Sequence, residues 1–115
     1  MNGTKELTEF VKTVIKYHET SDFEALSRLI SDTEIDSGVW FNEKQFIKVC
    51  DVIAKELGNI TSLEFIRILN RKTSFLTLWK STYTKSDDEV LWQISFDTAS
   101  NKITLMHINW EIIKE

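Results

Sequence analysis

In the first half of the chain, hydrophobic side chains recur every three or four residues, the spacing that gathers them on one face of an α-helix. The first positions with this spacing are Leu7, Phe10, Val11, Val14 and His18. They predict a helix over residues 5–19. His18 ends this helix, where a cationic side chain complements the helix dipole.

A second, shorter helix is expected directly after the first. The segment Ser21-Asp22-Phe23-Glu24 has the form of a capping box, in which the serine hydroxyl accepts from the glutamate amide and the carboxylate reaches back. The side chains that this helix is expected to bury are Phe23, Leu26 and Ile30. Residues 32–41 show no hydrophobic period, so we expect a loop there.

The clearest amphipathic stripe begins after Asn42, a favourable N-cap residue with Gln45 three positions later. Its apolar positions are Phe46, Val49, Cys50, Ile53 and Leu57. Gly58 then ends this third helix, because glycine adopts the left-handed conformation without a Cβ clash.

From residue 60 onwards, the hydrophobic period changes from helical to two, which is typical of β-strands. We expect four strands, near residues 61–71, 74–84, 89–97 and 102–111. Polar segments at 85–88 and 98–101 are suited to hairpin turns. The chain is therefore expected to form one α+β domain over residues 1–115, with three N-terminal helices followed by a four-stranded antiparallel sheet.

The alternation assigns the second and third strands an aromatic face and a wetter face. With a four-residue turn at 85–88, Tyr83 lies opposite Val90 and Trp79 lies opposite Ile94. The aromatic face then carries Phe75, Thr77, Trp79, Ser81, Tyr83, Val90, Trp92, Ile94 and Phe96. The wetter face carries Lys80, Thr82, Glu89, Gln93, Ser95 and Asp97.

The faces of the last strand depend on its register. A four-residue turn at 98–101 places Ile103, Leu105, His107 and Asn109 on the aromatic face. A slip of one residue would turn His107 outward and Met106 inward, because side chains alternate along a strand.

Composition indicates that the core can be complete without a metal or a disulfide. The 115 residues are 42% hydrophobic and include four Trp, seven Phe and two Tyr, which bury large areas. The only cysteine, Cys50, has no partner within the chain. No spacing of His, Cys and Asp suggests a metal site, and the three glycines are too dispersed for a phosphate loop. We therefore predict no cofactor.

Charge and hydropathy narrow the expected partners and location. The net charge is −4, and no basic run suggests binding to nucleic acid. The apolar stretches are too short to span a bilayer. The N-terminus lacks the apolar segment of a signal peptide, so a cytoplasmic location is the default expectation. A chain from which a leader had been removed would look the same.

Three helices followed by a meander of long strands resemble the nuclear-transport-factor-2-like superfamily, which includes ketosteroid isomerases and small polyketide cyclases. The resemblance rests on the opening helix ending in Tyr17, the Ser21-Asp22-Phe23-Glu24-Ala25-Leu26 segment and the Phe96-Asp97…Asn101-Lys102-Ile103 hairpin. It implies a curled, cone-shaped sheet with a pocket between its concave face and the helices, and a homodimer formed through the sheet. Enzymes of that superfamily use an acidic base inside the cone, whereas the aromatic face here carries no acid.

Two sets of residues are candidates for function. His107, beside Trp92 in the preferred register, is either a general base or polar ligand contact, or a half-buried histidine satisfied by a carbonyl or solvent. The aromatic side chains Trp40, Trp79, Tyr83 and Trp92 either line a pocket or fill a small core, and Asn109 lies one step from His107. Trp110, on the other face, is suited to a subunit interface.

Three hypotheses follow. The leading one is a non-catalytic, dimeric domain that binds a small apolar or aromatic ligand at Trp40, Trp79, Tyr83, Trp92, His107 and Asn109. The second is an isomerase, cyclase or hydratase that uses His107 as base, assisted by Tyr83 or a loop aspartate. The third is a protein-interaction module that uses the outer sheet face and Trp110.

Overall fold

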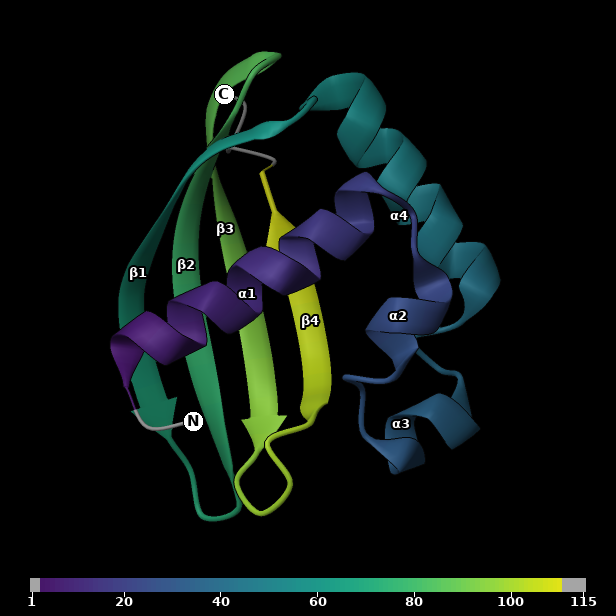
Figure 1. Ribbon diagram of the computed structural model, residues 1–115, viewed down its shortest axis with the longest axis vertical. Helices are drawn as coiled ribbons and strands as arrows, with labels where there is room; N and C mark the ends of the chain where they lie inside the picture. The colour runs from purple at the N-terminus through teal and green to yellow at the C-terminus, as the bar shows by residue number, and fades with distance from the viewer. Residues whose placement is uncertain (1–2, 111–115) are drawn as a thin grey trace, which may run out of the picture.

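The computed structural model describes residues 3–110, which form four helices followed by four strands (Figure 1). The helices are α1 (Thr4–Glu19), α2 (Phe23–Ser27), α3 (Asp32–Ser37) and α4 (Glu43–Glu56). The strands are β1 (Ile60–Asn70), β2 (Ser74–Tyr83), β3 (Ser86–Asp97) and β4 (Ile103–Asn109).

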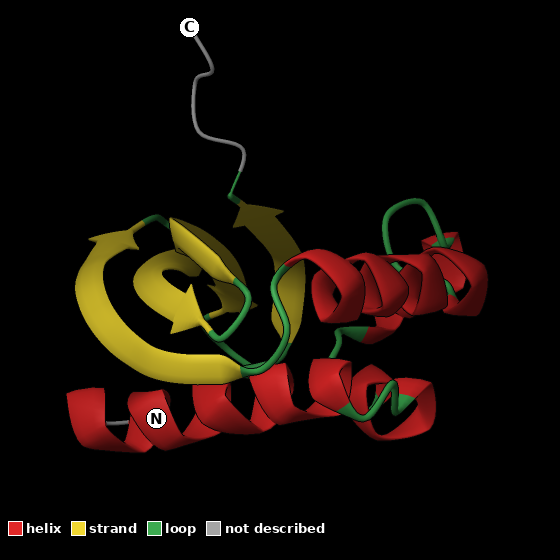
Figure 2. Ribbon diagram, turned by 90° about the horizontal axis from the view of Figure 1, so that it is seen from above, coloured by secondary structure: helices red, strands yellow, loops and turns green. Residues whose placement is uncertain are grey.

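The four strands form one antiparallel sheet in the order β1-β2-β3-β4. The sheet is strongly curled, and α1 crosses its concave side while α4 lies beyond the β4 edge (Figures 1 and 2). The predicted fold class, an α+β domain with N-terminal helices followed by a curled antiparallel sheet, is confirmed. None of the described helices is both long enough and apolar enough to cross a membrane.

The helix ends agree with the prediction for α4 and differ for α2. The Asn42 side chain accepts from the Gln45 amide at 2.9 Å, as expected for the N-cap of α4. At α2 the cap is Asp22, not Ser21, and its carboxylate accepts from the Ala25 amide at 3.1 Å. Ser21 has a positive φ of 54° in the turn that leaves α1, so the capping position falls one residue later.

The segment predicted as a loop over residues 32–41 begins with the short helix α3. Its hydrogen bonds start at Ser31, whose carbonyl accepts from the amides of Glu34 and Ile35. Six helical residues are too few to show a hydrophobic period, so the pattern could not distinguish this turn of helix from a loop.

The β2–β3 hairpin has a tighter turn than expected. Tyr83 pairs with Ser86, and Trp79 pairs with Trp92 instead of Ile94. The predicted pairing was therefore wrong by two residues at Trp79 and by four at Tyr83, but an even shift leaves every side chain on its predicted face. The aromatic face is buried as expected, apart from the half-buried Phe75.

The register of β4 is the one that turns His107 outward. Phe96 pairs with Ile103, but Ser95 pairs with Leu105, so Thr104 is an extra residue in the strand. This bulge reverses the faces that follow it. The prediction that Leu105, His107 and Asn109 share the aromatic face was wrong, since all three are exposed. Met106 and Ile108 pack against the core instead.

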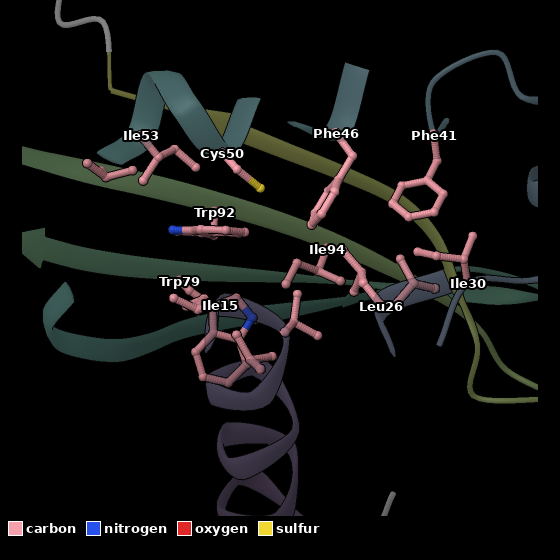
Figure 3. Packing of buried hydrophobic residues seen from close by; sticks show 14 of the residues in the cluster. Ile15, Leu26, Ile30, Phe41, Phe46, Cys50, Ile53, Trp79, Trp92 and Ile94 are labelled. Atoms are coloured by element: carbon pink, nitrogen blue, oxygen red, sulfur yellow. The ribbon is translucent and has the colours of Figure 1, made fainter. Parts of the chain in front are cut away.

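The core lies between the concave sheet face and the helices. Phe46, Cys50 and Ile53 of α4 point toward Trp92, as Figure 3 shows. Trp79 and Trp92 are 0% exposed, so the aromatic face is covered by packed side chains. Trp110, expected on the other face, also packs against this core because it follows the bulge.

Candidate functional site

A groove of about 480 Å³ opens between α4 and β4, and we call it the α4–β4 groove. Its apolar lining includes Trp40, Phe41, Phe46, Val49, Met106 and Ile108. The remaining lining residues are His18, Gln45, Lys48, Val52, His107 and Trp110.

Two local features create this groove. The bulge at Thr104 directs Met106 and Ile108 toward the helices. The backbone of α4 comes close to α1 and α2, but not over any length to β4. The backbones of α4 and β4 are therefore separated, and the groove between them is lined by side chains of both elements.

His18 forms part of the inner wall of the groove and is only 4% exposed. Its Nδ1 lies 2.9 Å from the Val14 carbonyl oxygen. A carbonyl only accepts hydrogen bonds, so Nδ1 carries the proton and donates it. Burial lowers the pKa of His18 from 6.5 to about 4, although the Val14 hydrogen bond acts in the opposite direction. The imidazole is therefore neutral at pH 7, and the prediction of a cation at the end of α1 was wrong.

The second ring nitrogen of His18, Nε2, forms no hydrogen bond with the described residues 3–110. Within this part of the chain, every fully shielded side-chain nitrogen or oxygen has a partner. His18 lines the α4–β4 groove, so the groove is the space from which a ligand can approach this ring. In the neutral ring with Nδ1 protonated, Nε2 is a hydrogen-bond acceptor.

The position of the His18 ring is fixed by aromatic neighbours. Its centroid lies 5.1 Å from that of Phe46 and 5.1 Å from that of Trp92, and both contacts are edge-to-face. The Trp92 indole in turn donates to the Tyr83 hydroxyl at 3.0 Å. Packing and hydrogen bonds thus hold Nε2 in one orientation, which favours recognition by preorganisation.

At the groove mouth, Trp40 is held by a hydrogen bond from its indole nitrogen to the Glu34 carboxylate, at 2.6 Å. Asn42 donates through its side-chain amide to the Gly38 carbonyl at 3.0 Å, which fixes the loop that carries Trp40. The short helix α3, missed in the sequence, therefore positions one of the predicted site residues.

The structure places the predicted site residues in three different locations. Trp40 and His107 line the α4–β4 groove, whereas Trp79, Tyr83 and Trp92 lie in the core behind it. Asn109 borders a second, more polar pocket of about 550 Å³, which also includes His107, Glu56 and Asp88.

His107 is exposed, and its Nδ1 lies 3.1 Å from the side-chain oxygen of Gln93. In the described part of the chain, no group of three or more His, Cys, Asp or Glu side chains is placed to hold a metal ion.

His18 is the site residue that sequence reasoning missed. A signal was present, since His18 follows Val14 by one helical turn in the apolar stripe of α1. A histidine in such a stripe is expected to be buried and neutral, and one of its nitrogens can be satisfied by the helix itself. The sequence does not show which element its other nitrogen faces.

A comparison of the sequence with protein-family models gives no match, and a comparison with curated proteins gives none either.

Proposed function

We propose that this chain is a small-molecule binding domain of the nuclear-transport-factor-2-like type, and that its ligand is apolar or aromatic. The observation that carries the proposal is the α4–β4 groove, whose mainly apolar lining includes His18, with a ring nitrogen, Nε2, that has no partner among residues 3–110. The groove volume of about 480 Å³ falls within the range of roughly 300–1,000 Å³ typical of ligand sites. The order of helices and a curled antiparallel meander supports the proposed kinship.

The lining favours binding over catalysis. The described residues around the α4–β4 groove include no carboxylate. An isomerase, cyclase or hydratase with His107 as base receives less support, because His107 is exposed and contacts an amide. General acid–base catalysis needs a titratable group within hydrogen-bond reach of the reacting atoms.

The test is a panel of hydrophobic ligands, measured by thermal shift and tryptophan fluorescence. Val49 lines the groove and is 38% exposed, so Val49→Phe should obstruct binding with little effect on folding. Ile66, an exposed residue of β1 outside the groove, provides the matched control Ile66→Phe. Binding that survives Val49→Phe unchanged would place the ligand elsewhere.

As a second proposal, two copies of the chain associate through the outer sheet face. Leu69 pairs with Leu76, Leu76 with Ser95, and Ser95 with Leu105, so one row across the four strands carries three leucines and a small serine. Leu105 is 47% exposed in the monomer. Leu69 and Leu76 are half-buried, and apolar surface that is left partly exposed in this way can form subunit contacts.

Sedimentation of the wild type and of Leu105→Asp tests the dimer. We expect a concentration-dependent dimer for the wild type and a monomer for the variant. Ile66→Asp, a charge placed on another exposed apolar residue, controls for a general loss of solubility. A wild type that remains monomeric at all concentrations contradicts the proposal.

A further inference from the structure

We propose that the ligand of the α4–β4 groove is a neutral hydroxylated aromatic molecule, a phenol, whose hydroxyl donates a hydrogen bond to His18 Nε2. This inference rests on the proposed binding function and names the chemical class of the ligand. It follows from three properties of the groove: the direction of its deep hydrogen bond, its charge, and the shape of its lining.

The first property is the direction of the hydrogen bond. Nδ1 of His18 donates to the Val14 carbonyl oxygen at 2.9 Å, and the ring cannot exchange its two nitrogens without losing that bond. Nε2 therefore carries a lone pair, and His18 lines the groove. A ligand must bring an O–H or N–H to this point, because a second acceptor would be repelled.

The second property is that the inner wall of the groove, at His18, carries no charge. Burial lowers the pKa of His18 to about 4, so near neutral pH the ring offers no positive charge to an anion. The other basic groups of the described lining are Lys48 and His107, both exposed. No carboxylate of the described lining is available to pair with a cation. A neutral ligand satisfies the inner wall without an unpaired buried charge.

The third property is the aromatic lining. Phe46 and Trp92 contact the His18 ring edge-to-face, and Phe46, Phe41 and Trp40 continue from there along the groove. Trp40 and Phe41 are neighbours with ring centroids 5.6 Å apart. Aromatic ligands pack well against such walls through offset and edge-to-face contacts. An aliphatic alcohol satisfies Nε2 but forms fewer of these contacts.

The experiment compares three ligands that share one ring system, by titration calorimetry at neutral pH. They are 2-naphthol, 2-methoxynaphthalene, which lacks the donor, and 2-naphthoate, which replaces it by an anion. We expect 2-naphthol to bind about tenfold more tightly than the methyl ether, because the ether covers Nε2 without satisfying it. The carboxylate should bind more weakly than both.

The variant His18→Phe keeps an aromatic ring against Phe46 and Trp92 but removes Nε2. In this variant, 2-naphthol and its methyl ether should bind with equal affinity. Equal affinities in the wild type would overturn the phenol inference and leave the proposed binding function standing. Failure of all three ligands to bind would overturn both.

A spectroscopic measurement on the wild type decides the matter if His18→Phe does not fold. In long-range ¹H–¹⁵N spectra, the unprotonated Nε2 of His18 should shift upfield when 2-naphthol binds, and not with the methyl ether. The variant His107→Gln assigns the signals, because the chain has two histidines. An unchanged Nε2 signal with bound 2-naphthol contradicts the inference.

Discussion

The aromatic face of β2 and β3 and the flank of β4 carry similar side chains, yet one is closed and the other is open. Trp79 and Trp92 on the first are completely buried, whereas Trp40 and Trp110 beside the second remain partly exposed. Helix α1 crosses over the strands of the sheet, as Figure 1 shows. The same residue type thus fills a core in one place and lines a groove in the other.

The difference arises from how α4 is attached. At its C-terminal end, Lys85 in the β2–β3 turn donates through its backbone to the Leu57 carbonyl at 2.8 Å and through Nζ to Ala54 at 3.1 Å. At its N-terminal end, Asn42 provides the cap. One side of the helix, represented by Phe46 and Ile53, is buried over the sheet. On the side toward β4, the described residues leave the α4–β4 groove open.

The largest expected effect comes from truncating the closed face. Trp92→Ala should lower the free energy of unfolding by about 3–5 kcal/mol, the cost typical of deleting a large buried aromatic side chain. Trp40→Ala, at the open groove, should cost about 1 kcal/mol, because Trp40 is only half-buried. Urea denaturation measures both. Equal losses of unfolding free energy in the two variants would contradict the conclusion that Trp92 belongs to a packed core and Trp40 to the wall of a groove.

The closed face was predictable from the sequence, and the open flank was not. An error of two residues in the β2–β3 pairing left Trp79 and Trp92 on the correct face, because the side-chain period is two. The single extra residue Thr104 reversed the faces of β4 from Leu105 onwards. A bulge has no hydrophobic signature, so the sequence left the position of His107 open between two registers.

The second effect concerns His18, which lies where the closed and open regions meet. Its pKa is about 4 in the folded chain and near 6.5 when unfolded, so the unfolded state binds the extra proton between these pH values. Stability is therefore full above about pH 6.5 and falls as the pH drops toward 4. The loss should be on the order of 3 kcal/mol, spread over the range between about pH 6.5 and about pH 4.

Carboxylates also titrate in acid, so the pH dependence must be measured against His18→Phe. Urea denaturation at each pH should show a shallower decline for this variant than for the wild type. His107→Gln provides the matched control, because His107 is exposed and its loss should leave the decline unchanged. A wild-type decline that His18→Phe fails to reduce would show that burial does not lower the pKa of His18 in the folded protein.

The third effect concerns the attachment of α4 to the sheet. Gly58 has a positive φ of 86°, and a Cβ there would lie 2.3 Å from the Thr84 hydroxyl oxygen. Gly58→Ala should therefore cost about 2 kcal/mol, from backbone strain and from the displacement of Thr84. Gly38→Ala is the control, with a φ of 61° and nothing within 4 Å, and should cost about 1 kcal/mol. Equal costs in thermal unfolding would show that Thr84 moves freely.

The smallest effect concerns the other end of α4, at the groove mouth. Asn42→Ala removes the side-chain oxygen that accepts from the Gln45 amide, and it should lower stability by about 1 kcal/mol. Asn42→Asp retains an oxygen for the cap but loses the bond from the side-chain amide to the Gly38 carbonyl. It should therefore keep most of the stability while loosening the loop that carries Trp40. Thermal unfolding measures the first difference. Quenching of tryptophan fluorescence by acrylamide in a Trp110→Phe background measures the second, because the other two tryptophans, Trp79 and Trp92, are 0% exposed and Trp40 gives the quenchable signal. An unchanged Trp40 signal in Asn42→Asp would mean that the Glu34 bond alone holds the groove mouth.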